Sequence, residues 1–401
     1  MNNEYQKIVS GGVTSPRGFK AGAASAGIKK NHDLDLAVLF SEKPGAAAGV
    51  FTTNLVKAAP VLLSRERIKG GAASAVVANS GCANACTGRQ GLADAEEVAG
   101  TVARDLGIPA EHVLAASTGV IGPRLPMERV REGLKKIILT VDGGHDLART
   151  ILTTDTRPKE VAVRHTAAGY VIGGAAKGAG MIHPNMATML AFLTTDAGIA
   201  PGLLDKVLRR AADVSFNMIS VDGETSTNDT LLLLANGQSG GAEIMEGSPE
   251  AESFQRGLDA VCMELARAIV RDGEGATKLF EVTVTGAPSA EEARLAARTV
   301  TTSPLVKTAI HGSDPNWGRV LAAVGRSGAR FDASRVDLRI GDVLLVRAGE
   351  PVGFDAAAVV TLLDRNEIGI RVDLNSGPAG ATAWGCDLSA EYVRVNSQYT
   401  T

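Results

Sequence analysis

The most unusual part of the sequence is a glycine-rich stretch with one lysine, GGAAKGAGMIHPNMATMLAF over residues 173–192. It fails as a phosphate loop, because Lys177 is followed by Gly178 where a Walker A loop needs Ser or Thr. No G-x-G-x-x-G can be read through Gly178 and Gly180 either. We interpret the stretch as a flexible segment that leads into a buried strand over residues 188–193.

Thr188 begins that strand and has the chemistry of a self-generated nucleophile. Attack of its hydroxyl on the preceding peptide bond would shift the acyl group from N to O, and hydrolysis of the ester would leave Thr188 as a new N-terminus. A free α-amine, with a pKa of roughly 7.7–8.0, can then take the proton from its own residue's hydroxyl near neutral pH. On spacing alone, a threonine that simply opens a strand is the favoured alternative.

Several blocks along the whole chain resemble the self-cleaving ornithine acetyltransferase (glutamate N-acetyltransferase) family of arginine biosynthesis. They are KGAGMIHPNMATMLAF at 177–192, AASTGVIG at 115–122, TTDT at 153–156, GEGATK at 273–278, HGSDPNWGR at 311–319 and NSQYTT at 396–401. The resemblance implies the layered α/β (α+β) fold shared with the self-processing DmpA-like aminopeptidases, with a smaller C-terminal α/β lobe.

The same resemblance assigns roles to residues. It implies cleavage between Ala187 and Thr188 into chains 1–187 and 188–401, with Thr188 as the acetyl-accepting nucleophile. Thr118 and Gly119 fall at the oxyanion-hole positions, where donors stabilise a tetrahedral intermediate. The implied substrate-binding residues are Thr154, Lys177, Thr188, Glu274, Asn396 and Thr401.

These residue types suit an amino-acid ligand, because an α-carboxylate needs a cation and hydroxyl donors while an amine needs a carboxylate. Lys177 would also lower the pKa of the Thr188 amine by charge repulsion. Simpler interpretations stay open: a strand-end turn for Thr118 and Gly119, and solvated surface charges for Lys177 and Glu274. The C-terminal residues Asn396 and Thr401 would have to be held in place, since chain ends usually fray.

The implied reaction is a ping-pong transfer of acetyl from N2-acetyl-L-ornithine to L-glutamate through an acetyl-threonine, giving L-ornithine and N-acetyl-L-glutamate. It requires no metal and no organic cofactor, and some members of the family also use acetyl-CoA as donor. The implied assembly is a heterotetramer of two α and two β chains. Two alternatives remain: a self-cleaving aminopeptidase or amidase with water as acceptor, and an uncleaved small-molecule binding or regulatory protein.

Composition limits the classes of protein to consider. The chain has 401 residues, 45% hydrophobic and 21% charged, which is a globular balance despite 46 glycines. A net charge of -3 argues against binding nucleic acid by phosphate neutralisation. No apolar run reaches the ~18 residues of a membrane helix, and the first residues lack a signal segment. Four cysteines imply no disulfide framework, so we expect a cytoplasmic protein.

Alternating apolar segments predict a mixed α/β fold. The expected strands cover residues 34–40, 73–79, 113–116, 161–164, 188–193, 230–235 and 280–284, and the expected helices cover 92–106, 130–139, 145–152, 203–214 and 251–270. Ser289 and Glu292 form a capping box for the next helix. We place a domain boundary there, with a catalytic lobe over 1–286 and a C-terminal lobe over 287–401. The C-terminal lobe should contain strands at 336–340, 343–346 and 368–372 and a helix at 356–363.

Other candidate chemistry is weaker. Cys82 and Cys86 are spaced C-x-x-x-C, but Arg89 stands where an iron–sulfur cluster would need a third cysteine, and zinc would need a second pair of ligands. We interpret these two, with Cys262 and Cys386, as buried small residues or turn neighbours. His311 and Asp314 could do acid–base work, but a helix start with Asp314 as N-cap and Pro315 as first residue is favoured. The spacing of His183 does not demand catalysis.

Overall fold

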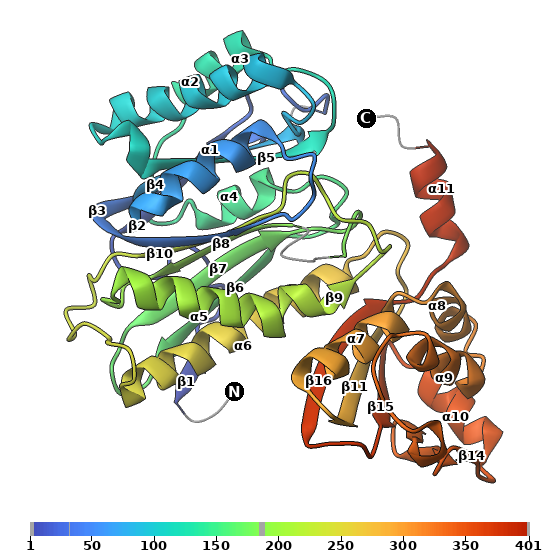
Figure 1. The fold of residues 1–401 in the computed structure, drawn as a ribbon. Coiled ribbons are helices and arrows are strands. Elements are labelled where there is room, and N and C mark those ends of the chain that lie inside the picture. Colours follow the sequence, from blue (N-terminus) through green and yellow to red (C-terminus); the bar gives the residue numbers. More distant parts are fainter. Residues whose placement is uncertain (1–3, 32, 184–188, 399–401) are drawn as a thin grey trace.

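The computed structural model describes residues 4–31, 33–183 and 189–398, and this part of the chain forms two β-sheets with helices packed on them (Figure 1). The larger sheet has the order β1-β6-β7-β8-β10-β3-β4-β5, with β2 paired to β3. The second sheet has the order β14-β13-β12-β15-β11-β16-β9. The predicted mixed α/β class is confirmed.

The strands of the larger sheet are β1 (Tyr5–Lys7), β2 (Phe19–Ala24), β3 (Leu36–Phe51), β4 (Ala72–Cys82), β5 (Val113–Val120), β6 (Lys159–His165), β7 (Val171–Lys177), β8 (Leu190–Thr195) and β10 (Thr230–Ala235). The helices that follow the same part of the chain are α1 (Ala59–Arg67), α2 (Gly88–Leu106), α3 (Met127–Leu134), α4 (Gly144–Thr150), α5 (Pro201–Val214) and α6 (Pro249–Arg271).

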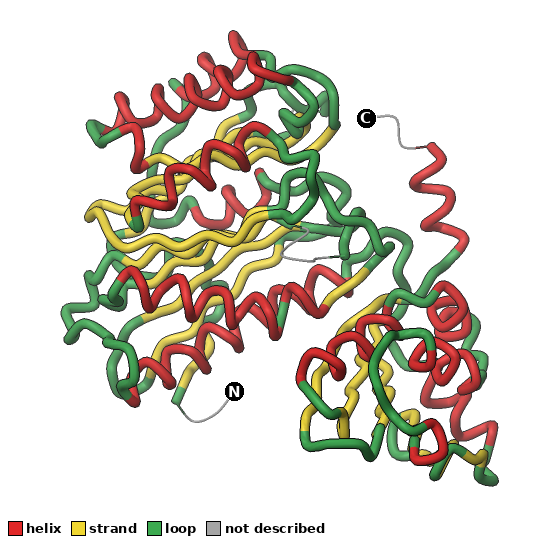
Figure 2. The backbone as a smooth tube through the Cα atoms, in the orientation of Figure 1, coloured by secondary structure: helices red, strands yellow, loops and turns green. Residues whose placement is uncertain are grey.

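Strand β3 shows how the sheet is layered, because successive side chains of a strand point to opposite faces. Leu36 and Val38 pack with α1, α2 and α3, whereas Ala48 and Val50 pack with α5 and α6. Ala37, which lies between Leu36 and Val38 and points to the other face, belongs to a separate cluster that includes residues of α4. Helices therefore cover both faces of the sheet, as Figure 2 shows for the yellow strands between red helices.

The second sheet consists of β9 (Ile219–Ser220), β11 (Leu279–Ala287), β12 (Asp337–Ile340), β13 (Val343–Arg347), β14 (Glu350–Pro351), β15 (Glu367–Asp373) and β16 (Ala379–Cys386). Its helices are α7 (Ala290–Thr301), α8 (Pro304–His311), α9 (Trp317–Gly325) and α10 (Ala356–Leu363). The last helix, α11 (Ala390–Gln398), extends away from this sheet (Figure 1).

Two helix starts test the capping predictions. Ser289 is the N-cap of α7, and its hydroxyl accepts a hydrogen bond of 3.2 Å from the Glu292 N–H, which confirms the predicted start. The predicted helix start at Asp314 and Pro315 is wrong: α9 begins at Trp317 with Asn316 as its N-cap. The Asn316 N–H instead bonds the Asp314 carbonyl, so the two predicted cap residues lie in the turn before the helix.

The interpretation of residues 173–180 as a flexible stretch is wrong in its first half. Gly173 and Gly174 lie in β7, which is buried and paired on both sides, with β6 and β8. A Cβ at Gly173 would lie 2.2 Å from the Gly12 carbonyl oxygen, and one at Gly174 would lie 2.7 Å from Leu193. Glycine is therefore present because neighbouring chain packs directly against this strand, and not because the strand is flexible.

The proposed domain boundary at 286/287 stays a prediction, but sheet membership bears on it. Strand β11, which ends at Ala287, lies between β15 and β16 inside the second sheet. The second sheet also contains β9 (Ile219–Ser220), which precedes α6, so strands on both sides of α6 belong to it before residue 286. Within the described ranges, no helix combines the length and apolar character needed to cross a membrane.

Candidate active site

A cavity of about 200 Å³ opens where β5 and β7 end and β8 begins. Six predicted site residues line it: Thr118, Gly119, Thr154, Lys177, Glu274 and Asn396. Met189, the residue bonded to Thr188, lines it as well. The remaining predicted residues, Ala187, Thr188 and Thr401, lie outside the described residues. Residues from widely separated parts of the sequence thus meet in one amino-acid-sized space.

The end of β5 is held in place by two asparagines. The Ser117 hydroxyl donates to Asn79 Oδ1 at 2.6 Å, and Asn228 Nδ2 donates to the Ser117 carbonyl at 2.8 Å. Gly119 has φ +129°, and a Cβ there would lie 2.4 Å from the carbonyl carbon of Gly81 on β4. Only glycine fits this approach of the two strands, so the backbone of Thr118 and Gly119 is fixed before any ligand binds.

Lys177, the last residue of β7, is buried, which excludes a solvated surface charge. Burial lowers the pKa of its ammonium group, while the carboxylates of Asp155, Asp229 and Glu274 oppose that shift. Among the described residues none accepts a hydrogen bond from Lys177 Nζ, so its donors are directed to whatever occupies the cavity. A buried cation without a bonded partner is an anion-binding group.

A buried network of three charged side chains, Lys159, Asp155 and Asp272, adjoins Lys177. Lys159 Nζ lies 2.6 Å from Asp155 Oδ1 and 2.6 Å from Asp272 Oδ2, and all three side chains are at most 3% exposed. Asp155 Oδ1 also accepts from the Gly178 N–H at 2.6 Å, which fixes the chain directly after Lys177. Burial opposes ionisation of Asp155, but the Lys177 and Lys159 charges hold the pKa of its carboxyl below the usual value.

Asp229 stands directly before β10 and lines the same cavity. Burial raises the pKa of its carboxyl well above the usual value, although the Lys177 charge lowers it. Its buried Oδ2 has no hydrogen-bond partner within the described ranges. Asp229 therefore brings to the cavity a buried carboxyl whose ionisation burial opposes and the Lys177 charge favours.

Glu274 brings negative charge to the lining of the cavity. A Cβ at Gly180 would lie 2.5 Å from each atom of the Glu274 carboxyl group, so glycine is needed there for the carboxylate to reach the cavity. Asn396 Nδ2 on α11 donates to Glu274 Oε2 at 2.8 Å. Tyr392, also on α11, donates from its hydroxyl to Asp222 Oδ2 at 3.4 Å. The C-terminal helix is thus held against the site, as the prediction for Asn396 requires.

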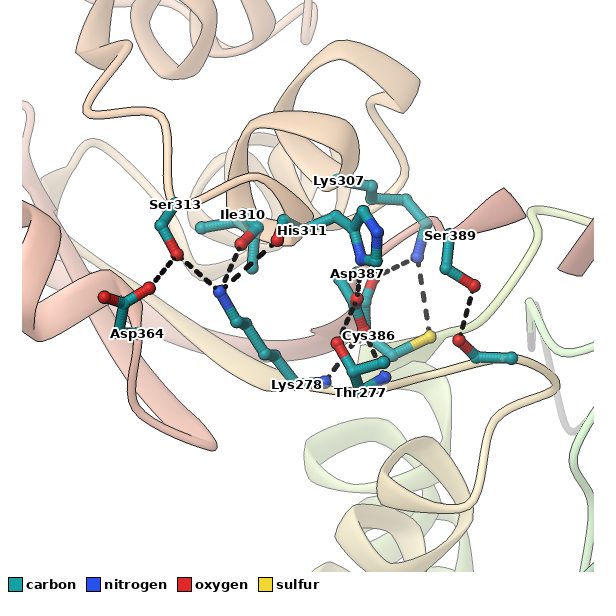
Figure 3. A network of polar contacts seen from close by, with 11 residues as sticks. Thr277, Lys278, Lys307, Ile310, His311, Ser313, Asp364, Cys386, Asp387 and Ser389 are labelled. Carbon is teal, nitrogen blue, oxygen red and sulfur yellow. Dashed lines mark hydrogen bonds and ion pairs between the residues drawn. The ribbon is translucent and has the colours of Figure 1, made fainter. Parts of the chain in front are cut away.

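The loop that carries Glu274 is fastened to the second sheet by Asp387 (Figure 3). This carboxylate accepts from Thr277 N at 2.8 Å, from Thr277 Oγ1 at 2.7 Å and from Lys278 N at 2.8 Å. His311 Nδ1 lies 2.7 Å from Asp387 Oδ2. Although burial opposes it, these bonds hold the pKa of Asp387 below its usual value. His311 therefore belongs to the support of the Glu274 loop and does not line the cavity.

His183 lies immediately before the undescribed segment. Its Nε2 lies 2.9 Å from the Arg298 guanidinium on α7, and its Nδ1 lies 3.3 Å from the Ser220 hydroxyl. Burial and the Arg298 charge lower the pKa of His183 to about 4, so the imidazole is neutral at physiological pH. His183 does not line the cavity, in keeping with the prediction that its spacing does not demand catalysis.

All four cysteines are free, and Cys86 is exposed at a bend while the others are buried. Cys82 lines a second cavity that adjoins the first. Within the ranges that the structure describes, no cluster of three His, Cys, Asp or Glu side chains could hold a metal ion.

Sequence reasoning missed Asn228, Asp229 and Lys159. Asn228 and Asp229 directly precede a strand that was predicted, and a polar pair at the end of a buried strand is a signal for a site. Lys159 gave no such signal, because it begins a strand where a charged residue is usually solvated. Asp155 was part of a matched block, TTDT, but no role followed from its position.

The chain is similar to known proteins along nearly its whole length. A model described as the ArgJ family matches residues 20–401. The arginine biosynthesis bifunctional protein ArgJ of Dehalococcoides mccartyi is 51% identical over 405 residues, covering all of both chains. That of Symbiobacterium thermophilum is 55% identical over 399 residues, covering 98% of this chain and 99% of the relative. The crystal structure of arginine biosynthesis bifunctional protein ArgJ from Bacillus halodurans is 42% identical, with a TM-score of 0.51, and covers 52% of this chain and 98% of its own. The chain described here belongs to the ArgJ family.

Proposed function

We propose that this acyltransferase of arginine biosynthesis moves an acetyl group from N2-acetyl-L-ornithine to L-glutamate through an acetyl ester on Thr188. The observation that carries the proposal is the single cavity lined by Thr118, Gly119, Lys177 and Glu274 and bordered by Met189. Its two opposite charges match an amino acid: the Lys177 cation suits an α-carboxylate, and the Glu274 carboxylate suits an amine. Ornithine and glutamate both carry an α-carboxylate, and ornithine carries a second amine.

Maturation would precede catalysis. The Thr188 hydroxyl attacks the Ala187 carbonyl carbon, the C–N bond breaks as the ester forms, and water hydrolyses the ester to free the Thr188 amine. The products are chains of 187 and 214 residues, and 214 of 401 residues is about 53% of the sequence. The Bacillus halodurans chain, matched over 98% of its own length, covers 52% of this sequence, which is the share expected for one processed half.

In the transfer itself, the Thr188 amine takes the hydroxyl proton while the oxygen attacks the acetyl carbonyl of acetylornithine. Thr118 and Gly119 would stabilise the oxyanion, a contribution of about 2.7–4 kcal/mol per donor. The tetrahedral intermediate expels ornithine, whose α-amine leaves with the proton. The α-amine of glutamate then attacks the ester, the C–O bond breaks and the proton returns to the threonine oxygen. No metal or organic cofactor takes part in these steps.

Three finer points belong to the same proposal. Acetyl-CoA is proposed as a second acetyl donor, which fits the word bifunctional in the names of the relatives. Two processed protomers are proposed to form a heterotetramer of two α and two β chains. The proposed location is the cytoplasm, since the four cysteines are free.

Denaturing electrophoresis with N-terminal sequencing tests the proposal directly. The purified protein should give two bands. One fragment should keep the original N-terminus, and the other should begin at Thr188. A Thr188→Ala variant should stay as one band and have no exchange activity, while Thr195→Ala, a change at the last residue of β8, should still be cleaved. A fragment that begins elsewhere would refute the mechanism. Acetylornithine consumed in large excess over the enzyme without glutamate would instead indicate a hydrolase, because the proposed scheme stops after one acetyl group per site.

A further inference from the structure

The loop over residues 272–278 carries Glu274 and connects α6, which packs on the larger sheet, to β11 of the second sheet. At the first residue of the loop, the Asp272 carboxylate accepts from Lys159 Nζ at 2.6 Å. At the other end, the backbone is held by the Asp387 carboxylate. Each end of the loop is therefore fixed by a buried carboxylate, and the place of Glu274 depends on both.

Each oxygen of the Asp387 carboxylate accepts two hydrogen bonds. Oδ1 accepts from the N–H groups of Thr277 and Lys278, while Oδ2 accepts from the Thr277 hydroxyl and from His311 Nδ1. The Asp387 side chain is 0% exposed. Although burial raises it, these bonds hold the pKa of Asp387 below its usual value, so the carboxylate is ionised and can only accept. His311 Nδ1 therefore carries the proton and fixes the position of Oδ2.

His311 belongs to the sequence block at 311–319, whose purpose the cavity does not explain. Lys278, the last residue of the loop, contacts the same block (Figure 3). Its Nζ donates to the Ser313 hydroxyl at 2.7 Å and to the Ile310 carbonyl at 3.0 Å, at the C-terminal end of α8, where the helix dipole favours a cation. The loop and this block therefore form one polar network, whose residues do not line the cavity apart from Glu274.

The middle of the loop fits closely against the start of α11. Gly275 has φ +69°, and a Cβ there would lie 2.5 Å from the backbone nitrogen of Tyr392. The Ser389 hydroxyl donates to the Gly275 carbonyl at 2.6 Å. Glu274 directly precedes Gly275 and bonds Asn396 farther along the same helix. A shift of the loop would therefore move the Glu274 carboxylate relative to both α11 and the cavity.

The position of Glu274 matters because the two proposed substrates differ at one end. Acetylornithine brings a free δ-amine, and glutamate brings a second carboxylate. The Glu274 carboxylate attracts the amine and repels the carboxylate, whereas Lys177 suits the α-carboxylate that both substrates share. Glu274 therefore discriminates between donor and acceptor, and Lys177 does not.

We propose that Asp387, oriented by His311, is the positioning residue that sets this discrimination. It holds the loop where the Glu274 carboxylate reaches the cavity, so that the site favours an amino acid with a second amine over an acidic one. Neither Asp387 nor His311 lines the cavity, so both act through Glu274. The inference rests on the proposed function, because it requires that one cavity takes both substrates in turn.

Calorimetric titration with L-ornithine and with L-glutamate measures the discrimination without turnover. In Asp387→Asn, one carboxylate oxygen becomes an amide nitrogen, which cannot accept a hydrogen bond. We expect ornithine binding to weaken about tenfold, while glutamate binding stays within about twofold or tightens. Asp196→Asn is the matched control, because Asp196 is also buried and accepts from two backbone N–H groups, of Arg17 and Val171, but does not line the cavity. Both affinities should be unchanged in the control.

Two variants of His311 separate position from charge. His311→Leu removes the donor, whereas His311→Asn supplies an amide N–H close to the place of Nδ1, and both replacements are uncharged. The His311 side chain is 42% exposed, so the fold should tolerate either change. We expect ornithine binding to weaken about threefold in His311→Leu and to be largely restored in His311→Asn.

Steady-state exchange gives a second readout, expressed per cleaved chain. Asp387→Asn and His311→Leu should lower kcat/KM for acetylornithine in proportion to the lost affinity for ornithine. The value of kcat/KM for glutamate should stay within about twofold, because the acceptor has no second amine for Glu274 to bind. A general loss of structure would lower both values together.

Equal weakening of ornithine and glutamate binding in Asp387→Asn, or ornithine binding as tight as in the unaltered protein, would overturn the inference. Identical ornithine affinities in His311→Leu and His311→Asn would overturn it as well, and this pair decides alone if Asp387→Asn does not fold. Absence of acetyl exchange in the unaltered protein would instead refute the proposed function. The two titrations would still show in that case whether Asp387 sets the discrimination.

Discussion

Lys159→Met removes the cation that the buried carboxylates of Asp155 and Asp272 share. Methionine has nearly the length of lysine, so packing changes little while the charge is lost. Lys159 Nζ lies 2.6 Å from each carboxylate. The exposed fraction of the side chain is 1% for Lys159, 0% for Asp155 and 3% for Asp272. Removing one partner of such a pair leaves uncompensated buried charge, which costs about 3–5 kcal/mol.

The structure favours the lower end of that range. After the change, Asp155 still accepts hydrogen bonds from the N–H groups of Gly178 and Thr153, at 2.6 Å and 3.2 Å. Asp272 still accepts from the Thr156 N–H at 3.0 Å. These donors keep part of the charge stabilised, so we expect the free energy of unfolding to fall by about 3 kcal/mol. That is roughly a hundredfold in the unfolding equilibrium constant.

Urea unfolding, followed by circular dichroism at one fixed protein concentration, measures the loss. Lys7→Met is the matched control, because Lys7 pairs with Glu264 at the surface and should cost less than about 1 kcal/mol. Adding Asp155→Asn and Asp272→Asn to Lys159→Met should recover part of the stability, since neutral amides then replace the two buried carboxylates that lost their shared cation. Equal losses for Lys159→Met and Lys7→Met, or a further loss in the triple variant, would refute the reasoning.

Three further predictions concern the site. Gly119→Ala places a Cβ 2.4 Å from the Gly81 backbone, and we expect kcat for acetyl exchange to fall at least 100-fold as the oxyanion position is displaced; unchanged kcat would contradict that role. Asn396→Ala removes the 2.8 Å bond to Glu274 and should raise KM for acetylornithine about tenfold while kcat stays within threefold, as steady-state kinetics would show. The pKa of His183 is about 4 when folded and near 6.5 when unfolded, so the unfolded state binds more protons between these values and stability rises with pH across that window. His183→Gln should flatten that rise in urea titrations at pH 4.5 and 6.5, and an unchanged slope would count against the neutral histidine.

The sequence predicted the strands whose side chains are uniformly apolar, and it did so to within a few residues. The strand predicted over 230–235 matches β10 at both ends, and the helix predicted over 356–363 matches α10. The prediction failed at β7, because Gly173 and Gly174 weaken the strand pattern. Glycine is needed at these positions because residues distant in the sequence pack directly against the strand. Periodicity describes one segment at a time, so a residue chosen for a neighbour far along the chain is invisible to it.

The site also contains residues that the sequence could identify and residues that it could not. Resemblance supplied Thr118, Lys177, Glu274 and Asn396, and the fold brings these four to one cavity. The groups that set the electrostatics of Lys177 come from a loop and two strands whose adjacency depends on the pairing of β6 with β7 and of β8 with β10. Sequence patterns do not report that pairing, which is why the partners Asp155, Lys159 and Asp229 were missed.

The order of strands in the larger sheet has a consequence for the proposed cleavage. A break after Ala187 would assign β1 to β7 to one fragment and β8 and β10 to the other. Because β8 pairs with β7 and β10 pairs with β3, the second fragment's two strands would be inserted between two groups of strands from the first. The fragments would then be interlocked parts of one sheet, and separating them would require its hydrogen bonds to open along two seams. Dissociation of the processed halves would therefore amount to unfolding, and under native conditions they should migrate as one species.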